Sequence, residues 1–510
     1  MAYKIAIAST DGEQIDLGFG QCDSFYIIEI ADDGSISNES SRKMNDQLEG
    51  EKRSEYQNLA CGGKVLFKAA QLADCDVVLC KEIGFQARKN LNSRGISVFD
   101  IDGTKTERLP RILSYLLKQK NPLDTVIPRT GTDSLKYDFV KERTGRNDLL
   151  PLWVADMDFA LPTDILDELK QRINHGIFGY TDPKEDYGKA LSSWYSKHHH
   201  WEISPSWNTV TPGVVYGLAQ AILAYTKPGD AVLIQQPVYY PFSEVILQND
   251  RVLINNELPF DGTAYQMDFA DLEEKIISNH VKMMILCNPH NPVGRVWTKE
   301  ELLQVECITQ KHDVLVFSDE IHGDFVYTGH TYIPFASLSK EAANHTIVGT
   351  SASKTFNIAG LQVSNILIPN GNLRKIYRKQ IAASGYSQGN TIGLLATRLV
   401  YERGEEWLDN LLRYLQGNLD YIREFLVENL PQVKLVEPEG TYLIWLDFAG
   451  LHIPSDEVES LIRNQAHLFL DSGRIFGEKS AYFHRVNIAC PRSILQQAMG
   501  QLYDAIQNLD

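Results

Sequence analysis

The chain of 510 residues lacks long apolar runs and is poor in clustered basic charge. It contains no stretch of about 18 apolar residues, which argues against a membrane-spanning helix. Lys and Arg form no long stripe, and a formal net charge of −17 argues against a nucleic-acid backbone as partner. The start, MAYKIAIASTDGEQ, becomes acidic and Gly-rich too early for a signal peptide. We therefore expect a cytoplasmic protein with no membrane or nucleic-acid partner.

Cysteine is scarce, and the first 120 residues contain no histidine. The seven cysteines are odd in number and irregular in spacing, which favours reduced thiols over a disulfide framework. Four of them, Cys22, Cys61, Cys75 and Cys80, lie in the first 118 residues, which indicates a separate domain there. A hydrophobic content of 43% allows the chain to bury several large cores.

One lysine lies in an unusual setting, the run SASKTFNIAGL. Ser351 and Ser353 precede Lys354, and a tight segment of small residues, 357–360, follows it. An amine beside hydroxyls and a small-residue turn suits a Schiff base next to a bound phosphate, which is the chemistry of pyridoxal phosphate. The alternative is a solvated surface lysine, which describes most lysines. Three upstream segments favour the first interpretation.

Two of these segments follow apolar runs that predict buried strands. FSDEIHGDF (317–325) places Asp319 at a strand's carboxyl end, where ligands bind in open parallel sheets, so this acid could hold a protonated pyridine nitrogen. CNPHNPVGRVWT (287–298) predicts a turn that leaves the Asn291 amide free to donate to a phenolate-like oxygen. The alternatives are a helix cap or ion-pair partner for Asp319 and a plain turn around Asn291.

The third segment, TPGVVYGLAQAI (211–222), predicts the start of an amphipathic helix. After Pro212 and Gly213, the first backbone N–H groups of this helix are free, so they can bind a phosphate. The alternative is that Pro-Gly only marks the helix boundary.

Asn291, Asp319 and Lys354, in that order, resemble the aspartate aminotransferase superfamily of fold-type I pyridoxal phosphate enzymes. From about Leu123 onward the chain resembles, more narrowly, the PatB/MalY-type cystathionine beta-lyases. The motifs are LPLWVADMDFALP, GYTD, QPVYYPF, PHNPVGRVWT, SDEIHGD, SASKTFNIAGL and HRVNIACPR. The resemblance implies that residues 122–510 form a large mixed-sheet α/β domain with a smaller α+β domain. It also implies a homodimer.

The resemblance assigns roles to single residues. Lys354 would bind the cofactor and move the α proton of the substrate as general base. Asp319 would pair with the pyridine nitrogen, and Asn291 would hydrogen-bond the cofactor's 3-oxygen. The remaining roles are ring stacking for Tyr239, phosphate binding for Gly213, Val214, Ser351 and Ser353, phosphate binding across a dimer interface for Tyr180, and binding of the substrate carboxylate for Arg485.

Two positions depart from the wider superfamily. His322 stands where many of its aminotransferases have tyrosine, and it either tunes the 3-oxygen or is a packed histidine. Gln362 stands where they often have an arginine, so we expect hydroxyls and backbone amides to bind the phosphate. In WVADMDF, Asp156 and Asp158 either face the entrance and help select the substrate or cap the helix predicted in LPTDILDELKQRI.

Residues 1–118 predict a small α/β domain, which we expect to be RNase H-like. Strands YKIAIAS, FYIIEI, VVLC and ISVFD combine with helices VLFKAAQLA and QARKNLNSR, and a polar loop rich in Ser, Asn, Glu and Lys follows FYIIEI. DLGFGQCDSFYIIEI and DCDVVLCKEIG resemble the NifX/NifB-type dinitrogenase iron–molybdenum cofactor biosynthesis domain. That resemblance implies binding of an iron–sulfur species or its precursor.

This family usually has a histidine where the chain has Gly18, so any metal ligands would be thiolates or carboxylates. Cys22 and Cys61 lie in polar or Gly-rich surroundings and are the candidate metal ligands. Cys75 and Cys80 flank a predicted strand and are equally well explained as small buried hydrophobes. The alternative is a domain that binds no cluster and serves for docking.

The boundary between the two domains falls within residues 114–137, where a helix ends near Lys120 and Pro and Gly then interrupt the pattern. Together the motifs predict a pyridoxal phosphate-dependent C–S lyase. It would convert a small amino-acid substrate, cystathionine or a related cysteine S-conjugate, to a thiol, pyruvate and ammonia. An aminotransferase is the nearest alternative because the same residues serve transamination. A cluster-carrier or interaction protein is the alternative from another class.

Overall fold

The computed structural model describes residues 2–31, 34–44, 68–94, 96–119 and 121–509, and Cys61 lies outside these ranges. The chain divides into two compact units, Met1–Pro122 and Leu123–Asp510. The division lies within a few residues of the domain limits predicted from the sequence. Each unit has its own sheets and its own apolar cores.

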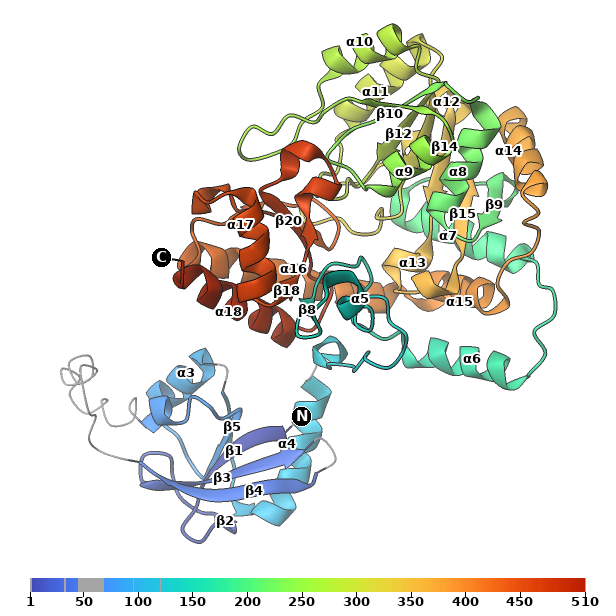
Figure 1. Ribbon diagram of the computed structural model, residues 1–510. Coiled ribbons are helices and arrows are strands. Elements are labelled where there is room, and N and C mark those ends of the chain that lie inside the picture. The colour runs from blue at the N-terminus through green and yellow to red at the C-terminus, as the bar shows by residue number, and fades with distance from the viewer. Residues whose placement is uncertain (1, 32–33, 45–67, 95, 120, 510) are drawn as a thin grey trace. The chain divides into compact units, whose positions relative to one another are not determined.

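The first unit contains a five-stranded sheet in the order β4-β3-β1-β5-β6. β3 is antiparallel to β1 and β4, whereas β5 is parallel to β1 and β6 is parallel to β5. This arrangement matches the RNase H-like fold predicted for the domain. The strands are β1 (Ala2–Ala8), β3 (Ser24–Ala31), β4 (Ile36–Lys43), β5 (Val77–Cys80) and β6 (Ser97–Asp100), beside a short pair of β2 (Gln14–Ile15) and β7 (Gly103–Thr104) (Figure 1).

Strand β4 lies where the sequence predicted a polar loop, and that prediction is wrong. Seven of its eight residues are exposed, and the remaining one, Arg42, is half-buried. Because β4 is at the edge of the sheet and its side chains face water, it has no apolar alternation that would reveal a strand. Exposed polar side chains at an edge also limit pairing with other chains.

Both faces of this sheet are covered. Along β1, Ala6 and Ala8 belong to one core and Ile5 and Ile7 to the other, because successive side chains of a strand point to opposite faces. Helix α3 (Phe85–Ser93) packs on the first core, and helix α4 (Lys105–Gln119) packs on the second. The small α/β domain expected from the sequence is therefore present.

The second unit contains a seven-stranded mixed sheet in the order β11-β10-β12-β13-β14-β15-β9. Neighbours from β11 to β14 are parallel, whereas β15 is antiparallel to both β14 and β9. The central strands are buried on both faces, as their continuous apolar runs require. The strands are β9 (Asn208–Thr211), β10 (Ala231–Ile234), β11 (Val252–Asn255), β12 (Met283–Cys287), β13 (Leu315–Asp319), β14 (Thr346–Thr350) and β15 (Ser364–Leu367).

Helices cover the two faces of this sheet and form separate cores. Helices α8, α9 and α14 pack on one face, and helices α10 and α11 pack on the other (Figure 1). The helices of this part are α6 (Thr163–Asn174), α7 (Glu185–His199), α8 (Val214–Tyr225), α9 (Pro241–Gln248), α10 (Phe269–Asn279), α11 (Lys299–Lys311), α12 (Lys340–Asn344), α13 (Ala352–Thr355), α14 (Gly371–Ala383) and α15 (Thr391–Arg403).

The smaller α+β part has a four-stranded antiparallel sheet in the order β16-β17-β20-β19. Its elements are β16 (Lys434–Val436), β17 (Leu443–Asp447), β19 (Asp471–Ser472), β20 (Phe483–Asn487), α16 (Glu405–Asn429), α17 (Ser455–Ser460) and α18 (Arg492–Gln507). Two elements near the start of the unit are α5 (Val140–Thr144) and β8 (Leu150–Pro151). Strand β8 pairs with β18 (Leu468–Phe469) and so joins the start of the unit to this smaller part. Large mixed-sheet and smaller α+β parts confirm the predicted fold class. Across the described ranges, no helix is long and apolar enough to span a membrane.

Candidate active site

The three motif residues converge at one edge of the large sheet. Asp319 ends β13, Asn291 follows β12, and Lys354 lies on α13 directly after β14. Because the carboxyl ends of parallel strands meet at the same edge, side chains far apart in sequence line a common cavity of about 190 Å³. The lining residues are Ala155, Pro212, Gly213, Val214, Val215, Tyr239, Cys287, Asn291, Asp319, Ile321, His322, Ser353, Lys354, Ala359, Gln362, Val363 and Ser364.

The Lys354 side chain is half-buried at this cavity. Its Nζ donates a hydrogen bond of 2.7 Å to the backbone oxygen of Ala155. Burial, followed by the positive charge of Arg485, lowers the pKa of Lys354 to about 8. A lysine with a lowered pKa holds a larger fraction of neutral amine near neutral pH, as a nucleophile or general base requires.

Asp319 is buried, with 4% of the residue's surface exposed. One oxygen accepts a hydrogen bond of 3.1 Å from the Ile321 N–H. Burial raises the pKa of Asp319 to about 7. Ionisation is therefore costly until a cation lies opposite the carboxylate.

Arg485 and Asn291 are joined across the site. Arg485 lies on β20, and its Nη1 donates a hydrogen bond of 3.0 Å to Asn291 Oδ1. This bond directs the Asn291 amide, so its nitrogen is the end left to donate elsewhere. Nη2 of Arg485 donates to the Trp153 backbone oxygen at 3.0 Å and pairs with Asp471. Within the described part of the chain, the buried Nε of Arg485 has no hydrogen-bond partner.

The residues predicted to bind a phosphate lie in two different settings. Gly213 and Val214 form the start of α8, where no side chain caps the first N–H groups, and Ser353 lines the same cavity. Ser351 does not line it, because its hydroxyl donates to the Val363 backbone oxygen at 2.6 Å and accepts from the Ser353 N–H at 3.0 Å. The hydroxyl hydrogen of Ser351 is thus committed to the backbone rather than directed at a phosphate.

Two further predicted residues line the cavity as aromatic rings. Tyr239 is half-buried, and desolvation raises the pKa of its hydroxyl to about 12, so the phenol stays protonated. His322 is 3% exposed, and burial lowers its pKa to about 3, so the imidazole is neutral. The His322 ring packs edge-on against Tyr442 with centroids 5.7 Å apart, while its Nδ1 has no partner among the described residues. His322 is therefore both packed and directed toward the site.

Tyr180, also a predicted site residue, is almost fully exposed to solvent. Its side chain is 97% exposed, and it does not line the cavity of its own subunit. Ile177 and Phe178, directly before it, are also exposed apolar residues. A role for Tyr180 in a neighbouring subunit stays a prediction.

Sequence reasoning missed several residues that hold the site together. Asp471 pairs with Arg485 only because β19 and β20 place them opposite each other. Asn487 donates from Nδ2 to the Val154 and Asp156 backbone oxygens, each at 2.6 Å. Asn487 could have been predicted, because it lies two residues after Arg485 and residues i and i+2 of a strand point to the same face. No local sequence signal marks Asp471.

The helix cap, one of the two alternatives for Asp156 and Asp158, is absent. Helix α6 begins at Thr163, and the residue before it, Pro162, makes no side-chain cap. Asp156 and Asp158 instead form ion pairs with Arg129, so the capping interpretation is wrong.

Cys22 of the first unit does not have the accessible setting expected of a metal ligand. Its side chain is buried in the apolar core, its Sγ donates to the Ser24 backbone oxygen at 3.0 Å, and burial raises the pKa of the thiol. Cys61, the other candidate, lies outside the described residues. In the described ranges, no group of three or more His, Cys, Asp or Glu is arranged to hold a metal ion.

The residues of the second unit fit pyridoxal phosphate. A buried carboxyl with a raised pKa suits a protonated ring nitrogen, a half-buried lysine with a lowered pKa suits covalent attachment, and an uncapped helix start suits a phosphate. The partnerless Nε of Arg485 suits a substrate carboxylate.

Comparison with known families divides the chain in the same way. Residues 147–502 match the family of aminotransferases class I and II. Residues 1–113 match the dinitrogenase iron-molybdenum cofactor family. The fusion predicted from the sequence is therefore confirmed.

Individual relatives resemble the second part of the chain along nearly their full length. Cystathionine beta-lyase PatB of Bacillus subtilis (strain 168) is 40% identical over 74% of this chain and 98% of its own. Protein MalY of Escherichia coli (strain K12) is 33% identical over 75% of this chain and 98% of its own. The structure of cystalysin from Treponema denticola, which contains pyridoxal 5'-phosphate, has a TM-score of 0.74 and 36% identity, and the match covers 77% of this chain and all of cystalysin.

Proposed function

The chain belongs to the aminotransferase class I and II family, and on this premise we propose that it is a pyridoxal phosphate-dependent C–S lyase. Its substrate is cystathionine or a related cysteine S-conjugate, and its products are a thiol, pyruvate and ammonia. The observation that carries the proposal is the placement of the Lys354 amine and the Asp319 carboxyl at one cavity, with the Arg485 guanidinium hydrogen-bonded to Asn291, which lines the same cavity. The resemblance to enzymes named cystathionine beta-lyase supports elimination over other reactions of the family.

The cofactor-binding residues divide by the part of pyridoxal phosphate that each would hold. Bound pyridoxal phosphate supplies an electron sink that makes the substrate's Cα proton removable. Asp319 would pair with the ring nitrogen, the Asn291 amide would hydrogen-bond the 3-oxygen, and Tyr239 would stack on the ring. The N–H groups at the start of α8, with Ser353, would bind the phosphate.

The substrate-binding groups are Arg485 and Lys354. The Arg485 guanidinium binds the α-carboxylate, since its free Nε offers a donor in the planar fork that a carboxylate matches. The Lys354 amine takes the proton from Cα, and its lowered pKa leaves a usable neutral fraction near neutral pH. The electron pair left on Cα forms a Cα=Cβ double bond as the Cβ–S bond breaks, and the sulfur leaves with the bonding electron pair as a thiolate. The released enamine then takes up one water and yields pyruvate and ammonia.

We also propose that the protein is a homodimer in the cytoplasm. Tyr180 would complete the phosphate site of the neighbouring subunit, which is consistent with its 97% exposure within one subunit. The six described cysteines are free thiols, as a reducing compartment favours. Mixing an inactive Lys354→Ala chain with an inactive Tyr180→Phe chain should restore part of the activity, whereas a fully active monomer would contradict the assignment of Tyr180.

The test of the reaction is incubation of the purified full chain with cystathionine, with and without a keto acid. Pyruvate and thiol formed without an acceptor support the lyase, whereas amino transfer that depends on the acceptor identifies an aminotransferase. Borohydride reduction should fix the cofactor on the peptide that contains Lys354. Recovery of the label on another lysine would refute the site, and Lys354→Ala should nearly abolish elimination.

A further inference from the structure

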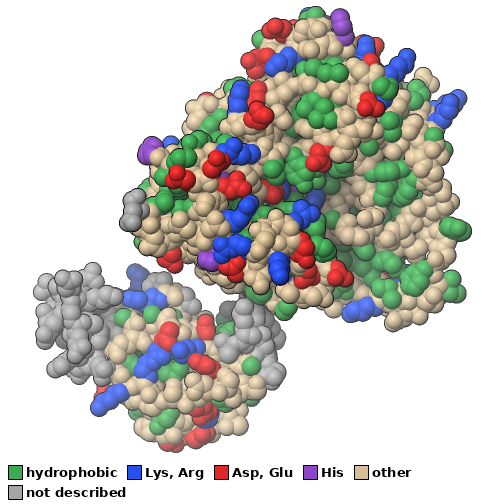
Figure 2. All heavy atoms as spheres, viewed as in Figure 1, with side chains coloured by type: hydrophobic (Ala, Val, Ile, Leu, Met, Phe, Trp, Pro, Cys, Tyr) green, Lys and Arg blue, Asp and Glu red, His purple; other side chains and the backbone are tan. Residues whose placement is uncertain are grey.

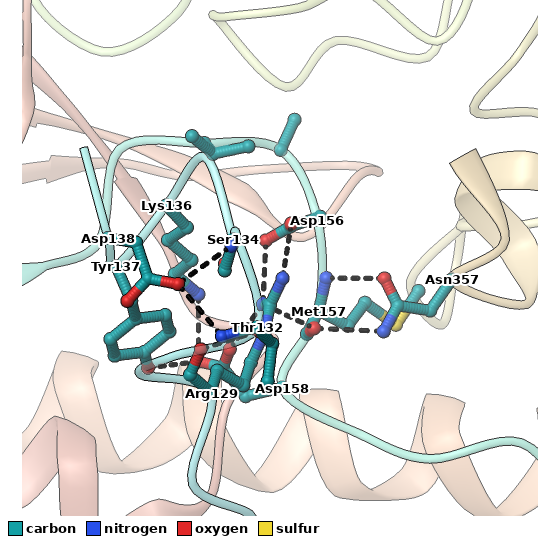
Figure 3. A network of polar contacts seen from close by, with 12 residues as sticks. Arg129, Thr132, Ser134, Lys136, Tyr137, Asp138, Asp156, Met157, Asp158 and Asn357 are labelled. Atoms are coloured by element: carbon teal, nitrogen blue, oxygen red, sulfur yellow. Dashed lines mark hydrogen bonds and ion pairs between the residues drawn. The ribbon is translucent and has the colours of Figure 1, made fainter. Parts of the chain in front are cut away.

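Residues 129–138, here called the strap, lie beside the active-site segment 153–159. The sequence placed the strap in the boundary region between domains. In the structure, its two cations, Arg129 and Lys136, and its phenol, Tyr137, contact the carboxylates of the active-site segment (Figure 3). The strap is thus part of the second unit's site rather than a linker.

Arg129 forms the first connection. Its Nη1 and Nη2 donate to the two oxygens of Asp156 at 3.0 and 2.7 Å, which is the paired geometry that a guanidinium and a carboxylate favour. Nη1 also donates to Asp158 Oδ1 at 2.8 Å and to the Met157 backbone oxygen at 3.1 Å. One guanidinium therefore contacts three consecutive residues of the segment.

Lys136 and Tyr137 form the second connection. Lys136 Nζ and the Tyr137 hydroxyl donate to Asp158 Oδ2 at 2.7 and 3.0 Å. The exposed fractions of the Lys136 and Asp158 side chains are 0% and 2%. Charges buried this completely persist only when they are paired and hydrogen-bonded, so the pair fixes the relative position of strap and segment.

The strap has its own internal support. Asp138 accepts hydrogen bonds of 3.0 Å from the N–H groups of both Thr132 and Ser134 (Figure 3). It also accepts one of 2.8 Å from the Gly131 N–H. Gly131 has a φ of +79°, in the left-handed region that favours glycine. The strap is therefore a tight turn in its own right, able to serve as a fixed support for the segment.

The other side of segment 153–159 contacts the active-site residues through its backbone. The Ala155 oxygen accepts from Lys354 Nζ at 2.7 Å, and the Trp153 oxygen accepts from Arg485 Nη2 at 3.0 Å. Asn357, three residues after the lysine, donates from Nδ2 to the Met157 oxygen at 2.9 Å. A shift of the segment would consequently move the acceptors of both the amine and the guanidinium.

We propose that Arg129, Lys136 and Asp158 are positioning residues, which anchor segment 153–159 so that its backbone oxygens hold Lys354 and Arg485 in place. The kinetic part of this inference rests on the proposed lyase function. The structural part concerns only the support of the segment, so the two can fail separately.

The experiment compares the full wild-type chain with the double variant Lys136→Met/Asp158→Asn. The double change removes the buried pair without leaving either charge unpaired. The single variant Tyr137→Phe removes one hydrogen bond to Asp158. The control is Lys189→Met/Glu185→Gln, because this ion pair on α7 is exposed on both sides, at 66% and 79%. Amide hydrogen exchange is measured without substrate, and kcat and KM are measured with cystathionine.

Relative to the wild type, the double variant should show a larger increase in exchange rate at the Met157 and Asp158 amides than at amides of the central sheet. Tyr137→Phe should show a smaller increase at the same two amides. Because a misplacement of about 1 Å can cost about 100-fold in rate, kcat should fall about 10- to 100-fold with a much smaller change in KM. Unchanged exchange at both amides, an equal increase throughout the unit, or an unchanged kcat in an active enzyme would overturn the inference. If the wild type eliminates no thiol, the proposed function fails, and the exchange measurement alone still decides whether the strap supports the segment.

Discussion

Replacing Asp319 with asparagine should have opposite effects on the stability of the cofactor-free protein and on cofactor binding. Burial raises the pKa of Asp319 from 3.8 to about 7. Between these values the folded protein keeps a proton that the unfolded chain releases, so stability falls as the pH rises from about 4 to 7 and is level above it. At about 1.4 kcal/mol per pH unit, the difference amounts to about 4 kcal/mol as an upper bound.

Asparagine keeps an oxygen for the Ile321 N–H but carries no charge. At pH 8 the cofactor-free Asp319→Asn chain should therefore be more stable than the wild type, by up to about 4 kcal/mol. Its affinity for pyridoxal phosphate should fall, because a protonated ring nitrogen loses the carboxylate opposite it. A single substitution thus separates the stability cost of the buried acid from its function.

The assay is urea unfolding of both cofactor-free chains between pH 5 and pH 8, followed by tryptophan fluorescence. All seven tryptophans lie in the second unit, so the signal reports the unit that contains the site. Glu320, whose pKa burial also raises to about 7, is present in both chains, so the difference between them isolates Asp319. Equal pH dependence in the two chains, or a variant less stable than wild type at pH 8, would refute the reasoning.

Arg485→Lys should lower kcat/KM at least about 100-fold, because an ammonium cannot make the paired contacts of the guanidinium fork, and a loss below threefold in steady-state assays would contradict this. Asp471→Asn should destabilise the second unit by about 3 kcal/mol in urea unfolding, because it leaves a buried guanidinium without a charged partner. Gly217→Ala should cost about 1–3 kcal/mol, because the new methyl would lie 2.5 Å from Ile366 Cδ1. The matched change Gly500→Ala, on a helix with open space around it, should not destabilise, and a similar loss in both would exclude the clash as the cause.

The sequence allowed the centre of the site to be predicted because its residues lie at strand ends. An apolar run followed by Asp319 or by Asn291 predicts where a buried strand stops, and parallel strands bring those ends together. The order of the motifs then supplies the remaining residue, Lys354. The structure brings the three residues to one cavity because chemistry and strand termination coincide in a few consecutive letters, and their roles stay predictions.

Residues that act through pairing across the fold could not be predicted this way. Asp471 supports Arg485 only through the register of β19 on β20, and Lys136 meets Asp158 only after the chain folds back over 22 residues. Strand β4 was missed for a related reason, because an exposed edge strand has no apolar alternation. Ser351 has the residue type of a phosphate ligand, yet its hydroxyl is used by the backbone.

The placement of charge around segment 153–159 explains how Lys354 can be both desolvated and reactive. The segment carries two carboxylates, but Arg129 and Lys136 neutralise them on the strap side. The amine instead receives a neutral acceptor, the Ala155 oxygen, which directs it without the full charge that would raise its pKa strongly. Burial and the nearby Arg485 then prevail and lower the pKa of Lys354 to about 8. The segment is anchored through its carboxylates on one side and holds Lys354 through a carbonyl oxygen on the other. It therefore fixes the position of the amine while a fraction of the amine stays neutral near neutral pH.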